Sequence, residues 1–322
     1  MFGWIGFILT GYRPGYRPGY RIDSIKNVLP GNIAGRTFFL FVGLRAGRSL
    51  KVILTSLSAV FLLSSITPAK DIIVPADYRS IQGAVNSADA GDTVIIENGR
   101  YEENVVITKP IILKSASGYG NVIIEAKNKN AAAIKIDRTS GAAITGVTTK
   151  GSSNMAGIHL YRSSGCRIFN NLSEDNHTGI YAEYSSGNTI SKNIARENTN
   201  GISLYFSNNN RLDDNIADSN SEKGITVFSS NGNILAGNTA NSNYWNGITL
   251  WSANNNILTD NTALDNSYSI VESYSEDNVM TGNRTMRRLY YILPIALAYF
   301  GIIIYFVEKK FFELFFSAAP SK

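Results

Sequence analysis

Residues 179–200 read GIYAEYSSGNTISKNIARENTN, and residues 201–223 read GISLYFSNNNRLDDNIADSNSEK. Both segments begin with Gly-Ile, carry Asn-x-(Ile/Leu)-x-x-Asn near the middle and end in a polar turn. Their apolar stretches are short and alternate with polar residues, which indicates β-strands and not helices. One such segment is too small to bury its own apolar side, so it must share a core with its neighbours.

The same unit recurs with steps of 22 or 23 residues. Gly-Ile pairs begin at Gly157, Gly179, Gly201, Gly224 and Gly247, with Ser269-Ile270 in the sixth place. An asparagine column keeps these steps at Asn171, Asn193, Asn215, Asn238, Asn261 and Asn283. Columns that stay in phase over six units indicate a solenoid.

Asparagine makes up 26 of the 143 residues from Gly141 to Asn283. Asn tolerates the left-handed backbone of tight turns, and stacked Asn amides can donate to and accept from one another. This composition favours a parallel β-helix over leucine-rich or helical solenoids. We therefore predict an all-β, right-handed parallel β-helix of about eight coils, with strands about 4.8 Å apart and the six-membered column as its structural ladder.

Less regular alternating strands extend this domain upstream, so that it covers residues 71–283. Ile81, Ala84, Val85 and Ala88 follow helical spacing. We expect this amphipathic helix to cap the first coil, which would otherwise expose its core and an unpaired strand edge.

The segment 289–307 contains nineteen residues without a charge and is followed by a short basic and apolar tail, 308–322. Nineteen residues at about 1.5 Å each are enough to cross a bilayer. The pattern predicts a single-pass transmembrane helix that holds the β-helix outside the cytoplasm of a cell-surface protein.

A shorter apolar run, Val52 to Leu63, follows basic residues and ends in small ones. This pattern is typical of a signal peptide, which we assign to residues 50–70. Signal peptides stand at the start of a chain, so we expect the true start near Leu50 and regard 1–49 as a doubtful extension. A real N-terminal anchor is the alternative.

The net charge of +5 is unevenly spread. Residues 1–70 carry +8, residues 284–322 carry +4, and residues 71–283 carry −7. An acidic repeat domain argues against a nucleic-acid partner, and basic flanks are typical of membrane insertion. One cysteine and two histidines leave no multi-cysteine zinc site and little for a soft metal, so no cofactor is expected.

The stretch from Ile73 to Val85 (IVPADYRSIQGAV), with Gly91-Asp92-Thr93-Val94 after it, resembles the entry of the pectin-lyase-like right-handed β-helix. The later repeats resemble those of NosD-like surface proteins and of the carbohydrate-binding and sugar-hydrolase class. That resemblance implies the fold but leaves activity open, because the superfamily holds both enzymes and non-catalytic members. Copper binding is attributed to NosD proteins, and no His/Met cluster carries it over to this chain.

An enzyme of this class would need an acid–base pair, or a carboxylate cluster that binds calcium. Asp213 and Asp214 are adjacent, and Lys192 lies one coil earlier. Of the polygalacturonase-type motifs only this Asp-Asp is present, and the Asp-Pro-His-Asp of alginate epimerases is absent. The three residues are weak catalytic candidates, and a lyase or epimerase acting on uronic-acid polymers is the alternative function.

The second and fourth residues after each Gly should point outward from the sheet. These positions place aromatic side chains in successive coils at Tyr161, Tyr181, Tyr205, Phe228 and Trp251. Exposed aromatic rows mark binding surfaces, and flat rings beside amides suit a polysaccharide or cell-surface glycan. Two interpretations stay open: the row binds glycan in a non-catalytic protein, or it stabilises the sheet of a structural or adhesion protein.

Three Asn-x-Ser/Thr sequons are compatible with an exported chain, at Asn171, Asn176 and Asn283. Two of them belong to the ladder column that should face inward. Asn176 is therefore the predicted glycosylation site.

Overall fold

The computed structural model describes residues 42–46, 49–53, 68–287 and 292–316, and it divides into two units, 1–67 and 68–322. In the first unit, β1 (Val42–Ala46) and β2 (Ser49–Ile53) form an antiparallel pair. Residues 54–67, which contain most of the predicted signal peptide, and most of the doubtful extension 1–49 lie outside the described residues. Both assignments stay predictions.

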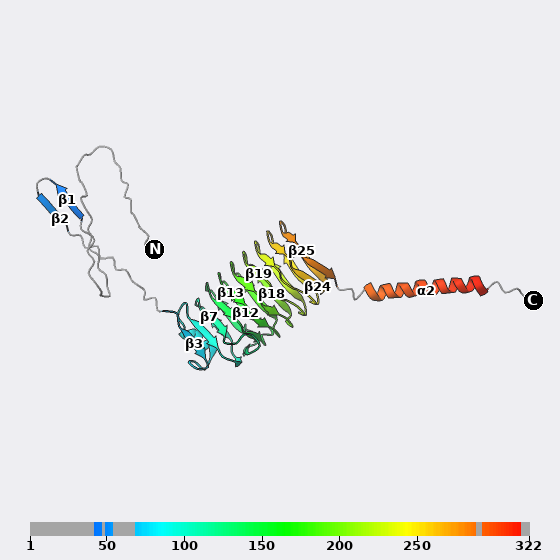
Figure 1. Ribbon diagram of the computed structural model, residues 1–322, viewed down its shortest axis with the longest axis horizontal. Helices are drawn as coiled ribbons and strands as arrows, with labels where there is room; N and C mark the ends of the chain where they lie inside the picture. The colour runs from blue at the N-terminus through cyan, green and yellow to red at the C-terminus, as the bar shows by residue number, and fades with distance from the viewer. Residues whose placement is uncertain (1–41, 47–48, 54–67, 288–291, 317–322) are drawn as a thin grey trace, which may run out of the picture. The chain divides into compact units, whose positions relative to one another are not determined.

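The second unit contains a parallel β-solenoid whose longest sheet has ten strands, so that it makes about ten turns (Figure 1). Each strand pairs in parallel with the equivalent strand one turn further on. In chain order the strands are β3 (Asp71–Val74), β4 (Thr93–Ile96), β7 (Ile112–Ser115), β10 (Ala143–Thr145), β13 (Arg167–Phe169), β16 (Thr189–Ser191), β19 (Arg211–Asp213), β21 (Ile234–Ala236), β23 (Ile257–Thr259) and β26 (Val279–Thr281).

An eight-stranded parallel sheet forms a second wall of the solenoid. Its strands are β6 (Val105–Ile107), β9 (Ile134–Asp137), β12 (Ala156–Tyr161), β15 (Thr178–Glu183), β18 (Asn200–Tyr205), β20 (Lys223–Phe228), β22 (Asn246–Trp251) and β25 (Tyr268–Ser273). The later members begin at or just before the Gly-Ile pairs.

The third wall is a five-stranded sheet that continues through single bridges at Ile216 and Thr239 into a final parallel pair. Its strands are β5 (Gly99–Glu102), β8 (Val122–Glu125), β11 (Thr148–Lys150), β14 (Leu172–Ser173) and β17 (Ile194–Ala195), and the final pair is β24 (Thr262–Asn266) and β27 (Arg284–Arg287).

The core runs along the inside of these walls as columns of aliphatic side chains. Ile180, Ile202, Ile225 and Ile248 are fully buried and stack in register. Their β-branched side chains pack well on a pleated surface. Each coil therefore shares its core with the coils on either side, as the short repeats required.

Buried asparagines join successive coils at the corners. The Nδ2 atom of Asn193 donates to Oδ1 of Asn215 at 3.0 Å and to the Ile168 carbonyl at 2.8 Å. Equivalent amide–amide bonds connect Asn171, Asn193, Asn215, Asn238, Asn261 and Asn283. These bonds satisfy polar groups that would be costly to bury alone.

The solenoid has more turns than the eight that the repeats suggested. Ile72 pairs with Val94, Val94 with Leu113, and Leu113 with Ile144, so the first steps are 22, 19 and 31 residues. These early coils lack the asparagine columns and vary in loop length, which hides them from a search for fixed spacing.

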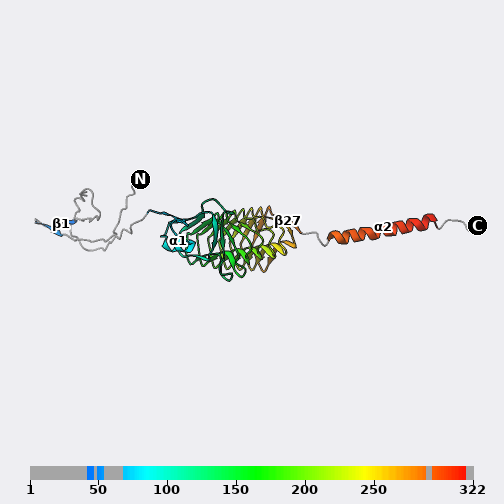
Figure 2. The same cartoon turned by 90° about the horizontal axis from the view of Figure 1, so that it is seen from below.

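A short helix, α1 (Ile81–Ser87), lies beside the first coils (Figure 2). Its N-cap is Ser80, whose side chain accepts a hydrogen bond from the Gly83 amide. Ile81, Ala84 and Val85 are buried, and the helix packs against β3, β4 and β6. The apolar helix face predicted from the spacing of these residues is therefore buried against the solenoid.

The second helix, α2 (Ile292–Phe316), includes most of the predicted membrane segment, whose first residues lie outside the described part. Among the residues that the structure describes, no helix is both long and apolar enough to span a membrane.

Candidate functional site

The outer face of the eight-stranded sheet carries the residues predicted to bind glycan. In β12, Ile158 and Leu160 are buried in the core, whereas His159 and Tyr161 alternate with them and point to the other side. The strand register then aligns two outward columns, a middle one through Tyr181 and a strand-end one through Tyr205. The structure thus brings all five predicted aromatic residues to one face.

The strand-end column is mainly aromatic. Tyr205 stacks on Phe228 with ring centroids 4.8 Å apart, and Trp251 follows one coil later with 43% of its surface exposed. Tyr161 stands two coils before Tyr205, and Glu183 occupies the place between them. From Tyr161 to Trp251 the strand-end column therefore has flat apolar surface at every coil but one, where it carries a carboxylate.

A second aromatic column, which the sequence analysis missed, lies in the turn directly after these strands. Tyr184, Phe206 and Tyr274 are 48%, 44% and 79% exposed. Tyr184 stacks on Phe206 at 5.2 Å, Phe206 meets Phe228 edge-on at 5.8 Å, and Tyr274 lies 5.1 Å from Trp251. All three follow the glycine (or Ser269) column by five residues, so the repeat spacing contained the signal. We call the strand-end and turn columns together the aromatic stripe.

The middle column changes character along the solenoid. His159 stacks on Tyr181 at 5.0 Å, and the next coils place only the small residues Ser203, Thr226 and Thr249 in the same column. A cleft of about 450 Å³ opens where the side chains become small. Its walls include Tyr181, Tyr205, Asn200, Glu222, Lys223 and His177. The cleft therefore combines ring surface with hydroxyl, amide and charged groups.

Further aromatic side chains lie at the other end of these strands, where the strands begin. Trp245 is 46% exposed and lies 6.0 Å from the ammonium nitrogen of Lys223, measured to its ring centroid. Tyr244 and Tyr268 are also exposed. They stand at or just before the start of strands, outside the two outward positions of each strand that predicted the aromatic row.

Burial sets the protonation of three rings, those of His159 and Tyr181 in the middle column and of Tyr205 in the strand-end column. The pKa of His159 falls to about 4, chiefly because the ring is buried and also because of the charge of Lys135. Its Nε2 atom lies 3.2 Å from Oε2 of Glu183. Burial likewise raises the pKa of Tyr181 and of Tyr205 above the usual value. At neutral pH these three rings are uncharged and can present hydrogen-bonding groups beside the cleft.

The weak catalytic candidates lie on another wall. Asp213 ends β19 of the ten-stranded sheet, and Asp214 and Lys192 occupy the turn after that wall on successive coils. Oδ2 of Asp213 binds Nε of Arg211 at 2.5 Å. Within the described chain no side-chain hydrogen bond or ion pair joins Lys192 to either aspartate. The structure therefore does not bring these residues together with the aromatic stripe.

Asn176 lies in a second buried ladder, not in an exposed turn. It is 5% exposed, and its Nδ2 atom donates to Oδ1 of Asn198 and to the carbonyl oxygens of Thr149 and Glu174. The ladder continues through Asn220, Asn243 and Asn266. In the folded protein this amide nitrogen is inaccessible to a glycosylating enzyme.

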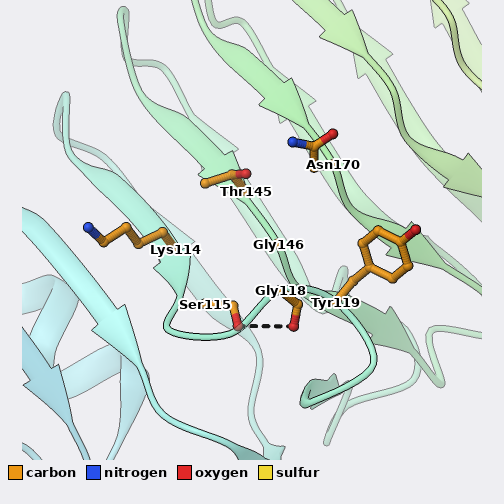
Figure 3. Close-up of a pocket in the computed structure, with 7 residues that line it drawn as sticks. All are labelled: Lys114, Ser115, Gly118, Tyr119, Thr145, Gly146 and Asn170. Carbon is orange, nitrogen blue, oxygen red and sulfur yellow. Dashed lines mark hydrogen bonds between the residues drawn. The ribbon is translucent and has the colours of Figure 1, made fainter.

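A separate hollow of about 380 Å³ lies near the early coils (Figure 3). Lys114, Tyr119 and Asn170 are among its lining residues, and the hydroxyl of Ser115, another of them, donates to the Gly118 carbonyl at 3.1 Å. It holds a single exposed ring and no aromatic row, so the cleft beside the stripe is the better candidate site.

Comparison with known proteins agrees with this architecture. A family model described as periplasmic copper-binding protein (NosD) matches residues 85–286. No curated protein sequence matches the chain. Similar solved structures are DFA-IIIase from Arthrobacter chlorophenolicus A6 (TM-score 0.55, 14% identity, 69% of this chain and 66% of that chain), pectate lyase Pel9A (0.51, 15%, 70% and 76%) and a mutant of the periplasmic alginate epimerase AlgG (0.51, 20%, 61% and 51%).

At these identities the likeness concerns the fold alone. The chain spans about half the length of the alginate epimerase that it matches.

The copper binding named in that family description can be tested against the donor groups. Copper sites draw on Cys, His and Met side chains. Cys166 is buried, and burial raises the pKa of its thiol, which opposes the thiolate that a metal needs. Among the described residues no three His, Cys, Asp or Glu side chains are placed to hold a metal ion. The described donor set does not fit copper.

Proposed function

The chain belongs to the NosD family, and from its outer face we infer that it binds a glycan outside the cytoplasm without catalysing a reaction. The observation that carries this proposal is the aromatic stripe beside a cleft lined by Ser203, Thr226 and Asn200. Sugars offer apolar ring faces and hydroxyl groups, and the stripe and the cleft match these two chemistries. The family description as periplasmic supports an extracytoplasmic site.

Binding must be distinguished from a purely structural role of the stripe, because stacked rings also stabilise neighbouring strands. Trp251→Ala and Tyr205→Ala remove one exposed and one half-buried ring. We expect each to weaken glycan binding about tenfold, which corresponds to about 1.4 kcal/mol. A glycan array followed by calorimetry on the best ligand measures this loss.

Tyr119→Ala is the matched control, since its ring is 44% exposed but lies at the separate hollow. Thermal unfolding of each variant separates lost binding from lost folding. If the wild-type protein binds no glycan while Trp251→Ala and Tyr205→Ala lower the melting temperature, the stripe is structural and the protein is a structural or adhesion element of the cell surface.

The alternative is a lyase or epimerase acting on uronic-acid polymers. The similar pectate lyase and alginate epimerase share the fold, which is compatible with this alternative but does not establish it. Incubation with acidic polysaccharides, with and without calcium, would reveal a lyase by the absorbance of unsaturated uronides and an epimerase by a change in the NMR spectrum of the polymer. Loss of such activity in Asp213→Asn or Asp214→Asn would assign it to the Asp-Asp pair.

The proposal also assigns a role to each helical segment. We propose that the segment 289–307, which has nineteen uncharged residues between basic flanks, anchors the protein in the cell membrane, and that α1 caps the first coil. The full-length protein should stay in the membrane fraction during alkaline extraction. A protein truncated after Arg287 should instead be released into the soluble fraction. Sequencing the mature N-terminus would test the signal peptide in the same preparation.

A further inference from the structure

Three cationic side chains gather around one ring at the early end of the aromatic stripe. The ring centroid of Tyr161 lies 4.7 Å from Nζ of Lys135, 5.4 Å from Cζ of Arg138 and 5.3 Å from Cζ of Arg162. Arg162 also lies 5.7 Å from the ring of Tyr184. Cations favour the negative faces of aromatic rings, so the rings fix these charges in place.

These charges are only partly compensated. The carboxylate of Asp137 lies 3.0 Å from Nζ of Lys135 and 3.3 Å from Nη1 of Arg138. Arg162 is exposed and has no ion pair within the described chain. Glu183, which follows Asp137 and Tyr161 in the strand-end column, contacts His159. The guanidinium of Arg162 is therefore available to a ligand.

The backbone places both arginines in line with the stripe. Arg138 and Arg162 adopt φ of 50°, and Tyr184 and Phe206 follow in the same turn column with φ of 49°. Non-glycine residues rarely take this left-handed conformation, and here it repeats coil after coil. A ligand lying along the stripe would thus meet rings over the later coils and guanidinium groups over the earlier ones.

The buried His159 adds no further charge to this end of the stripe. Its pKa is lowered chiefly by burial, and of the two nearby charges Lys135 lowers it whereas Asp137 raises it. The imidazole stays neutral near pH 7, so the cluster contains three cations and two carboxylates. Arginine presents a planar fork that pairs with carboxylate, sulfate or phosphate through two hydrogen bonds.

We propose that Arg162, supported by Arg138 and Lys135, forms a subsite for an acidic group of the bound glycan, so that the ligand is a charged polysaccharide and not a neutral one. This inference rests on the proposed glycan binding at the stripe. The acidic group is a carboxylate or a sulfate, which Arg162 would recognise through the same fork.

The test compares matched ligands by calorimetry on the full chain in detergent. The probes are a uronic-acid oligomer, its carboxyl-reduced neutral counterpart and a sulfated oligomer of the same length. We expect the wild-type protein to bind at least one acidic oligomer about tenfold more tightly than the neutral one, with an affinity that falls as salt rises. The better of the two acidic ligands identifies the source of the charge.

Arg162→Gln should remove this preference and its salt dependence while binding to the neutral oligomer stays unchanged. Arg167→Gln is the matched control, because Arg167 is exposed on the ten-stranded sheet. Equal binding of acidic and neutral oligomers by the wild-type protein would overturn the subsite and leave glycan binding intact. Absence of binding to all three probes by a protein that unfolds cooperatively would overturn the acidic subsite, whereas the glycan array decides on glycan binding itself.

Discussion

His159 shows how one buried side chain links the site to stability. It is 4% exposed, stacked on Tyr181, and its Nε2 atom contacts Glu183. Its pKa is about 4 in the folded chain, against 6.5 for an unperturbed histidine. Because the neutral ring is the form that packs, an unfolded chain takes up a proton at a higher pH than the folded one.

Acidification should therefore destabilise the folded protein. Between pH 6.5 and about 4 the unfolded state binds more protons, so stability is highest above this window and falls as the pH decreases through it. We expect His159 to account for a loss of about 3 kcal/mol between pH 7 and pH 4. The free energy of unfolding of the His159→Gln protein should decrease correspondingly less over the same pH interval. Urea denaturation at several pH values measures both slopes, and parallel curves for the two proteins would contradict the assignment.

Asparagine illustrates what could and could not be read from single positions. The phase of the Asn171 column predicted a ladder because stacked amides satisfy one another, and the hydrogen bonds have this pattern. Membership of a different column predicts an accessible side chain at Asn176. Its own column forms a second ladder, and column phase alone does not tell which corners of a coil face inward.

At the scale of the coil, the Gly-Ile glycines are required by close packing and not by backbone conformation. A Cβ atom on Gly201 would lie 2.5 Å from the Gly224 carbonyl oxygen and 2.8 Å from Nδ2 of Asn220. Neither neighbour can retreat, since one belongs to the adjacent strand and the other to the ladder. The glycine column and the second asparagine ladder therefore depend on each other.

Gly201→Ala should destabilise the protein by about 1 to 3 kcal/mol through overpacking. Asn200→Ala is the matched control, because the preceding side chain lies on the outside and its loss creates no overlap. Chemical denaturation of both variants measures the difference. A Gly201→Ala protein as stable as the wild type would mean that the coils can separate locally without cost.

Strands were predictable from sequence because their alternation decides which residues face the core. The turn column was not, since left-handed backbone is expected at Gly and Asn, whereas Tyr184 and Phe206 occupy it here with φ of 49°. Their rings stack on each other, and Phe206 meets Phe228 of the strand-end column edge-on; these tertiary contacts outweigh the local preference. The catalytic candidates were found by adjacency in sequence, which does not report the wall on which a residue lies.

At the scale of the whole solenoid, each coil contacts mainly the coils before and after it, so one complete repeat should be removable. Residues 201–223 form such a repeat, because Asn200 and Lys223 occupy equivalent positions before Gly201 and Gly224. Deleting them joins two coils whose isoleucine and asparagine columns remain in register. We expect a cooperative thermal transition within a few degrees of the wild type and weaker glycan binding, since Tyr205 and Phe206 leave the stripe.

Deleting residues 201–212 removes half a coil, shifts every later column away from its partner and should abolish folding, as circular dichroism would show. Equal melting temperatures for the two deletions would mean that the columns do not determine the fold.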